Sequence, residues 1–208
     1  MILIDFSGIA IAPIVMGHAR YDDENLIRHM ILNSIRMYRK KFKPFGEVVI
    51  VADGGGNWRK EVYPEYKGNR KVTREESKID WNEAFRIINM ILQEIKDYMP
   101  YKVIHQQGCE ADDSIAEIVH YTQEFGNYEN IMIVSADKDF RQLQVFDNVS
   151  QFSTVTKKFI KEDNPRLYLA EHILTGDSSD GVPNVLSDDD TFLIEGKRQN
   201  VLSKKKKE

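Results

Sequence analysis

The sequence predicts an α/β fold in which a central, mostly parallel sheet is flanked by helices. Short apolar runs rich in β-branched residues recur along the chain, amphipathic helical patterns lie between them, and the two kinds of segment alternate. Apolar strands without strict polar alternation are typical of a parallel sheet that is covered on both faces. Strands that alternate with helices indicate β–α–β crossovers.

The expected strands are the apolar runs at residues 2–4, 48–51, 102–104 and 131–134. The expected helices cover residues 26–39, 81–99 and 111–125. The second of these helices has the clearest pattern, because its apolar residues form one continuous stripe. Asp80 stands before it as an N-cap, and Pro100 closes it. From Gly176 onward Asp, Ser, Gly and Lys prevail, and no further long helix is expected.

The composition describes a folded chain whose charges are segregated. With 208 residues, of which 41% are hydrophobic and 30% charged, a packed core is expected. The single cysteine, Cys109, excludes an internal disulfide framework and a CxxC zinc site. No apolar run approaches the roughly 20 residues of a membrane span and no leader is recognisable, so we expect a cytoplasmic protein. The net charge of −4 argues against a general nucleic-acid binder, but basic residues cluster at 36–43, 58–74 and 197–207.

Acidic side chains follow three of the expected strands. Asp5 directly follows the first strand, Asp53 the second, and Asp137 and Asp139 the fourth. Ligands of open α/β sheets bind beyond the carboxyl ends of the strands, so these acids are expected at one edge. Each acid alone reads more simply as a turn residue or helix cap, but together they would repel one another unless a cation neutralised them. The candidate set is Asp5, Asp53, Glu110, Asp112, Asp113, Asp137, Asp139, Asp177 and Asp180.

A set of oxygen ligands without His or Cys selects a hard divalent ion, Mg²⁺ or Mn²⁺. The number of acids exceeds what one ion needs. Two ions roughly 4 Å apart would suit an in-line displacement at phosphorus. We therefore expect two Mg²⁺ ions, with Mn²⁺ as a substitute, and the hydrolysis of a phosphate ester.

The segment between Asp53 and Asp80 interleaves basic and aromatic residues. Its candidate substrate-binding residues are Trp58, Arg59, Lys60, Tyr66, Lys71 and Arg74, and it also contains Lys67 and Arg70. Such a mixture suits backbone phosphates and base stacking. Taken alone the segment is more often a solvated surface, but beside an acidic metal site we expect it to clamp the substrate. The glycines at residues 54–56 permit close approach of the backbone to a ligand.

Taken in order, these motifs resemble the flap endonuclease / 5′-nuclease family. The matching motifs are Asp5, Asp53-x-x-x-x-Trp-Arg, Tyr66-Lys67-x-x-Arg70, Glu110-Ala-Asp-Asp113, Ser135-x-Asp137-x-Asp139 and Gly176-Asp-x-x-Asp180. The similarity runs from residue 2 to about 182. It implies a PIN-like 5′-nuclease core over residues 1–175, with a basic arch at about 57–78. Residues 176–208 would then be an incomplete, partly disordered DNA-binding region.

The resemblance also implies a role for each group of residues. Asp5, Asp53, Asp113 and Asp137 would belong to a first metal site, with Glu110 and Asp112 close by, and Asp139, Asp177 and Asp180 to a second. Lys67 and Arg70 match the basic pair that steadies the scissile phosphate. The remaining basic and aromatic residues of the arch would contact the substrate.

By the same resemblance, the activity would be a Mg²⁺-dependent 5′-3′ exonuclease or flap endonuclease that removes RNA primers and 5′ flaps during replication or repair. The substrates would be DNA with 5′ flaps or ends and RNA/DNA hybrids, and a sliding clamp or single-strand-binding protein would be the partner. We expect a monomer that does not bind membranes. Gly181 stands where the family usually has Asn, and no helix-hairpin-helix follows, so we expect a weak grip on duplex DNA.

Other functions stay open at this point. A PIN-like ribonuclease also uses strand-end acids, although it needs fewer of them. A structure-specific nucleic-acid-binding module without catalytic activity is the alternative from a different class, and its binding would persist in EDTA. A phosphoaspartyl phosphatase is less favoured, because Asp5-Phe-Ser lacks the second acid that such enzymes carry two residues on.

Overall fold

The computed structural model describes residues 1–70, 74 and 76–203 of the chain. These residues form two compact units. The sheet unit consists of Met1–Gly56 and Ile79–Asp163, and the second unit of Asn57–Lys78 and Asn164–Glu208. The packing therefore changes after Asp163. The functional division expected at residue 175 stays a prediction.

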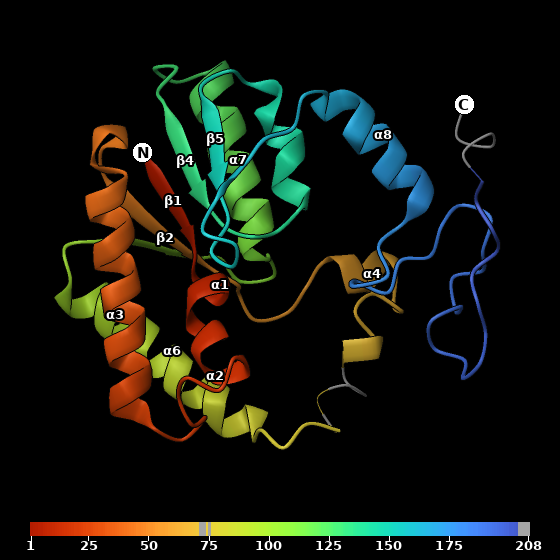
Figure 1. Cartoon of the computed structure of the whole chain (residues 1–208), viewed down its shortest axis with the longest axis horizontal. Coiled ribbons are helices and arrows are strands. Elements are labelled where there is room, and N and C mark those ends of the chain that lie inside the picture. The colour runs from red at the N-terminus through yellow and green to blue at the C-terminus, as the bar shows by residue number, and fades with distance from the viewer. Residues whose placement is uncertain (71–73, 75, 204–208) are drawn as a thin grey trace. The chain divides into compact units, whose positions relative to one another are not determined.

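A six-stranded sheet forms the centre of the sheet unit, with the strand order β3-β2-β1-β4-β5-β6 (Figure 1). The strands are β1 (Ile2–Asp5), β2 (Val48–Ala52), β3 (Lys102–His105), β4 (Ile131–Val134), β5 (Val149–Phe152) and β6 (Phe159–Ile160). The first five strands run parallel, and β6 is antiparallel to β5. The α/β class and the expected strands are confirmed.

Helices cover both faces of this sheet. They are α1 (Phe6–Ala10), α2 (Ala12–Val15), α3 (Glu24–Lys41), α6 (Trp81–Tyr98) and α7 (Ala111–Glu124), with 3₁₀ helices η1 (Lys43–Phe45) and η2 (Asp139–Val145). Ile2 and Ile4 of β1 join the core cluster formed with α1, α3 and α6. Leu3, between them, joins the cluster formed with α7 and η2. Because both faces of β1 are buried, its sequence shows no polar alternation.

Helix α6 shows why the sequence pattern predicted its bounds closely. The Asp80 carboxylate accepts hydrogen bonds from the backbone N–H groups of Asn82 and Glu83, which caps the first turn. Its buried stripe consists of Ala84, Ile87, Ile88, Ile91, Leu92 and Ile95. The helix ends at Tyr98, because Pro100 cannot continue the backbone hydrogen bonding.

The register of the central strands sets the position of their carboxyl ends. Asp5 lies level with Val51 of β2, and Ile4 lies level with Val134 of β4. The segments that follow β1, β2 and β4 therefore leave the sheet at the same edge. This edge carries the acids that the sequence placed after three strands.

The second unit contains α4 (Arg59–Val62) and α8 (Pro165–Thr175), followed by a bridge between Asp177 and Val182. Helix α8 begins at Asn164, whose side chain accepts from the N–H of Leu167. It was not predicted, because none of its residues is buried and it carries no apolar stripe. Throughout the described residues, no helix is long and apolar enough to cross a membrane. The lysine run at 204–207 lies outside the described residues.

Candidate active site

Asp5 ends the central strand and caps the helix that follows. Its Oδ1 accepts from the N–H of Gly8 at 3.3 Å, and its Oδ2 accepts from the Ser135 hydroxyl at 2.8 Å. Burial raises the pKa of Asp5 to about 6; the Ser135 hydrogen bond opposes this rise, and the negative charges of Asp53 and Asp137 add to it. The surroundings of Asp5 therefore disfavour the ionised form of its carboxyl group.

Asp53 joins the end of β2 to two helices of the sheet unit. Its Oδ2 accepts from the Ser7 hydroxyl at 2.7 Å, and its Oδ1 accepts from the N–H of Ala111 at 2.9 Å. Ala111 is the first residue of α7, so the carboxylate lies at the positive end of that helix. The two contacts fix the Asp53 carboxylate at the sheet edge.

Gly54 explains one part of the glycine run. Its N–H donates to the carbonyl of Cys109 at 2.8 Å, and a Cβ at this position would lie 1.8 Å from the carbonyl oxygen of Gln106. No side chain fits there. The sequence analysis expected the glycines to admit a ligand, whereas Gly54 packs closely against the loop before α7.

The acids at 110–113 occupy the start of α7. The N–H of Glu110 donates to Oδ2 of Asp113 at 2.9 Å, as part of a capping box. Asp112 lies in the first turn and is half-buried. The Asp113 side chain therefore stabilises the first turn of α7. Asp53 contacts the same end of this helix through the N–H of Ala111.

Asp137 and Asp139 lie in the loop after β4. The N–H of Asp137 donates to the Ser135 hydroxyl at 3.1 Å, and the N–H of Asp139 donates to Oδ1 of Asp137 at 2.9 Å. The fully buried Gln151 of β5 donates to the carbonyl oxygens of Ser135 and Asp137. The sequence analysis missed Gln151, because strand β5, which carries the two polar residues Ser150 and Gln151, was not predicted.

A divalent cation fits this edge of the sheet. Asp5, Asp53 and Asp137 offer only carboxylate oxygens, the donors that hard cations prefer. Asp53 and Asp137 are exposed, and after burial their negative charges also raise the pKa of Asp5. The ionised form of Asp5 is therefore repelled by both. A cation would relieve this repulsion.

A cavity of about 420 Å³ adjoins Asp53 within the sheet unit. Ser7 and Gly55 line it on the polar side, and Phe85 and Ile88 of α6 contribute apolar surface. The cavity thus places aromatic and apolar side chains beside a candidate metal ligand.

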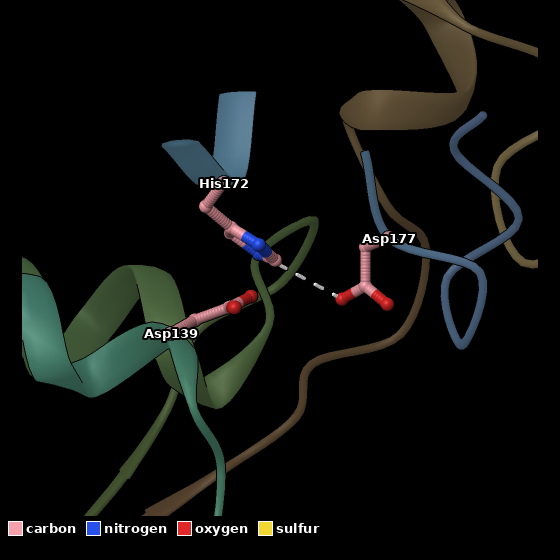
Figure 2. Close-up of side chains that lie close together, drawn as sticks. All are labelled: Asp139, His172 and Asp177. Carbon is pink, nitrogen blue, oxygen red and sulfur yellow. Dashed lines mark ion pairs between the residues drawn. The ribbon is translucent and has the colours of Figure 1, made fainter. Parts of the chain in front are cut away.

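In the second unit, Asp177 binds its own loop and a histidine. Its Oδ1 accepts from the N–H and the hydroxyl of Ser179, at 2.9 and 2.6 Å. Its Oδ2 lies 4.0 Å from Nε2 of His172. Figure 2 marks this pair with a dashed line. The ring of Tyr168 stacks on His172 with a centroid distance of 5.7 Å. The sequence analysis did not connect His172 with Asp177, because helix α8 was not predicted.

Asp180 of the same motif contacts the basic segment instead. Its Oδ1 accepts from Arg70 at 2.6 Å, and its Oδ2 accepts from the Tyr66 hydroxyl at 2.9 Å. Nζ of Lys67 lies 3.6 Å from the same Oδ2. Both predicted catalytic cations therefore gather at one carboxylate.

The other predicted substrate contacts differ in exposure. The Arg59 guanidinium lies over the rings of Trp58, at 4.8 Å, and Tyr66, at 5.7 Å. Trp58 is half-exposed and Tyr66 is buried. Lys60 and Arg74 are exposed, and Lys71 lies outside the described residues.

Comparison with known proteins decides the family. Residues 20–170 match the 5′-3′ exonuclease, N-terminal resolvase-like domain. The chain belongs to this family. It is 38% identical over 206 residues to ribonuclease H of Enterobacteria phage T4. This match covers 94% of this chain and 67% of that protein. It is 32% identical over 183 residues to flap endonuclease Xni of Shewanella denitrificans. This match covers 81% of this chain and 66% of the Shewanella protein.

Solved structures of the 5′-3′ exonuclease family have the same fold. The T5 5′-exonuclease with bound zinc ions matches with a TM-score of 0.73 and 20% identity, over 89% of this chain and 69% of that one. A complex of the bacteriophage T5 flap endonuclease with DNA and metal ions matches with a TM-score of 0.73 and 19% identity, over 88% and 69%. The PIN-like architecture and the family resemblance expected from the sequence are confirmed.

Membership of the 5′-3′ exonuclease family also determines the class of protein. Relatives are named ribonuclease H, flap endonuclease and, in Buchnera aphidicola, 5′-3′ exonuclease. The chain is thus an enzyme of a nuclease family, as expected, and a phosphoaspartyl phosphatase is excluded. It spans about two thirds of the phage relative but only 48% of the Buchnera relative, with which it shares 31% identity over 67% of its own length.

Proposed function

We propose that this chain is a Mg²⁺-dependent 5′-nuclease that hydrolyses phosphodiesters in DNA and in RNA/DNA hybrids. The observation that carries the proposal is that Asp5, Asp53 and Asp137 follow neighbouring strands at one edge of the sheet, where burial and then the charges of Asp53 and Asp137 raise the pKa of Asp5. A cluster of mutually repelling carboxylates makes little sense in a protein that only binds phosphates. It suits a protein that binds divalent cations there.

The proposed metal ligands follow the sequence motifs. Asp5, Asp53, Asp113 and Asp137 would hold one ion, with Glu110 and Asp112 nearby, and Asp139, Asp177 and Asp180 would belong to a second. Mg²⁺ is the expected ion, and Mn²⁺ would substitute for it. The chemistry that bound divalent ions supply is the activation of a water molecule and the stabilisation of charge on the leaving oxygen.

The protein's own side chains orient these groups and the substrate. Ser7 and Ser135 donate hydrogen bonds to Asp53 and Asp5, which holds both carboxylates in fixed directions. Lys67 and Arg70 would stabilise the negative charge that develops on the phosphate oxygens. The stacked pair of Trp58 and Arg59 would contact a base of the substrate strand.

The proposed substrates are DNA with 5′ flaps or ends and RNA primers paired to DNA. The names of the relatives, ribonuclease H and flap endonuclease, support this choice, as does the T5 flap endonuclease complex with DNA. We place the activity in the cytoplasm at replication forks, in the host cell if the protein is encoded by a phage. The protein would act there as a monomer beside a sliding clamp or single-strand-binding protein.

Cleavage of a labelled 5′-flap duplex tests the proposal. We expect cutting in Mg²⁺, none in EDTA, and none by Asp137→Asn in Mg²⁺. Asp147→Asn is the matched control, because Asp147 is an exposed acid of the sheet unit that precedes β5, at the opposite end of the strand from the carboxyl ends that carry the candidate ligands. Equal flap binding with and without EDTA, and no cutting in either, would instead support the non-catalytic binding module.

A further inference from the structure

The amide of Gln151 is fully buried at a position that suits an apolar side chain. Gln151 and Val149 are two residues apart in β5, so their side chains lie on the same face of the sheet. Val149 packs on that face in the cluster formed with α7 and η2. A buried amide in such surroundings costs free energy unless its polar atoms find hydrogen-bond partners. The partners of Gln151 therefore indicate what the amide does.

Gln151 holds the loop after β4 by two backbone carbonyl groups. Its Nε2 donates to the carbonyl oxygen of Ser135 at 3.2 Å and to that of Asp137 at 2.5 Å. An amide nitrogen carries two hydrogens, so one side chain can serve both acceptors. The two carbonyl groups stand on either side of Ala136. One amide thus fixes the backbone at the start of this loop.

The same stretch of backbone sets the direction of the acids. The Ser135 hydroxyl donates to Asp5 at 2.8 Å and accepts from the N–H of Asp137 at 3.1 Å. Oδ1 of Asp137 in turn accepts from the N–H of Asp139 at 2.9 Å. A shift of the backbone at residues 135–137 would therefore change the direction of the Asp137 and Asp139 carboxylates. It would also loosen the contact between Ser135 and Asp5.

Gln144 of η2 holds the other end of the Gln151 amide. Nε2 of Gln144 donates to Oε1 of Gln151 at 3.4 Å and to the carbonyl oxygen of Ile160 at 3.3 Å. Oε1 of Gln144 accepts from the N–H of Glu162 at 2.9 Å. Because the oxygen of Gln151 accepts from Gln144, its nitrogen is directed at the loop. All of these residues belong to the sheet unit.

We infer that Gln151 is a positioning residue, which fixes the loop that carries Asp137 and Asp139 before a cation binds. The inference rests on the proposed function for what the two carboxylates bind. Groups that hold metal ligands in place typically contribute about 10- to 100-fold to metal affinity or activity. The buried amide therefore serves the acidic edge of the sheet and not the packing of β5.

Two substitutions test this role. Gln151→Met removes the amide and leaves an unbranched apolar side chain of similar length in the core. Gln144→Met removes the group that orients the Gln151 amide. Gln123→Met is the matched control, because Gln123 is also buried and donates to a backbone carbonyl, that of Glu129 at 3.1 Å. Glu129 precedes β4, at the opposite end of the strand from the acids.

Three quantities are measured for each variant. They are amide hydrogen exchange at Asp137 and Asp139 in EDTA, Mn²⁺ affinity by calorimetry, and steady-state cleavage of the 5′-flap duplex at several Mg²⁺ concentrations. The first describes the loop without any metal. The second and third measure what the position of the loop contributes to cation binding and to turnover.

We expect Gln151→Met to speed exchange at Asp137 and Asp139 about tenfold or more, while amides of β1 and β2 are unchanged. Its Mn²⁺ affinity should fall about tenfold. Its kcat at millimolar Mg²⁺ should fall about 10- to 100-fold, with KM changed less than about threefold. Part of the lost kcat should return as Mg²⁺ is raised, which a general loss of stability would not produce.

The other variants are expected to rank below Gln151→Met. Gln144→Met should change the same three quantities in the same direction by about threefold. The double variant should lose no more than Gln151→Met alone, because Gln144 acts through Gln151. Gln123→Met should keep Mn²⁺ affinity and kcat within about twofold of the wild-type values, although it also loses a buried hydrogen bond.

Unchanged exchange at Asp137 and Asp139 in a folded Gln151→Met variant would overturn the inference. Mn²⁺ affinity and kcat equal to those of the wild type would overturn it equally, as would an equal loss of both in Gln123→Met. If circular dichroism shows that Gln151→Met does not fold, Gln144→Met decides by the same criteria. A wild-type chain that neither binds Mn²⁺ nor cleaves the flap would contradict the proposed function instead, and exchange in EDTA would still decide whether Gln151 fixes the loop.

Discussion

The acids of the sheet unit and the acid at position 180 stand in opposite electrostatic surroundings. Burial of the Asp5 carboxyl, and to a smaller extent the negative charges of Asp53 and Asp137, raise the pKa of Asp5 to about 6. Asp180 accepts from Arg70 and Tyr66 and lies beside Lys67. The same residue type is thus left with surplus negative charge in one region and is neutralised by cationic side chains in the other.

The largest expected effect is that of Asp53→Asn, which removes one charge from the sheet edge. Turnover of the 5′-flap substrate should fall about a thousandfold or more, because a metal ligand contributes several kcal/mol to the transition state. Single-turnover cleavage measures the loss, and circular dichroism checks the fold. Asp147→Asn should cleave normally. Near-normal cleavage by Asp53→Asn would remove Asp53 from the metal site.

In the second unit, Lys67→Ala should act on chemistry more than on binding. We expect turnover to fall about a hundredfold while affinity for the flap, measured in Ca²⁺, falls less than about threefold. The exposed Lys60→Ala is the comparison within the same segment and should lose much less turnover. The reverse pattern, with affinity lost and turnover kept, would make Lys67 a simple contact residue.

The raised pKa of Asp5 predicts an unusual pH dependence of stability. Because the folded state holds the Asp5 proton up to about pH 6 and the unfolded state releases it near the usual value of 3.8, Asp5 destabilises the metal-free protein as the pH rises between these values. Each pKa unit corresponds to about 1.4 kcal/mol. In EDTA at pH 7, Asp5→Asn should therefore melt several degrees higher than the wild type, by roughly 5 °C.

Divalent ions provide the companion measurement. Millimolar Mg²⁺ should raise the melting temperature of the wild type at pH 7, since a ligand that binds only the folded state stabilises it. The increase should be smaller in Asp5→Asn. A wild-type melting temperature that does not respond to Mg²⁺ would contradict a metal site at the sheet edge.

The smallest effect is expected at Asp80, which caps α6 as Asp5 caps α1. Asp80→Ala should lower the free energy of unfolding by about 1 kcal/mol, the usual cost of losing an N-cap. Urea denaturation measures it. Asp80→Ala should thus destabilise the protein, whereas Asp5→Asn should stabilise it. An Asp80→Ala variant that is more stable than the wild type would show that the loss of an N-cap had been confused with the relief of charge repulsion.

How much the sequence predicts follows the same division of the molecule. In the sheet unit, local patterns were sufficient to predict four strands, helix α6 and the acidic edge. Apolar runs predicted the strands, an apolar stripe with its caps predicted α6, and the acids after the strands predicted that they lie at one edge of the sheet. Strands β5 and β6 were missed, because Val149–Phe152 carries two polar residues and Phe159–Ile160 is very short. In the second unit, helix α8 has no apolar stripe to detect.

The contact between Asp180 and the basic segment could not be predicted either. Tyr66 and Asp180 are far apart in the sequence, and no periodicity or spacing links a lysine in the arch to an acid near the end of the chain. The left-handed φ of Lys67 has no sequence signal, since lysine does not favour it. Roles carried over by motif position are therefore most dependable where a strand fixes the residue.

The place of β1 in the sheet has a consequence for how the protein is made. This strand lies between β2 and β4, and β4 begins only at Ile131. Pairing over so long a separation is slow to form. Asp5 and Asp137 are thus brought together only once β4 has been synthesised, so no fragment that ends before β4 carries a complete acidic edge.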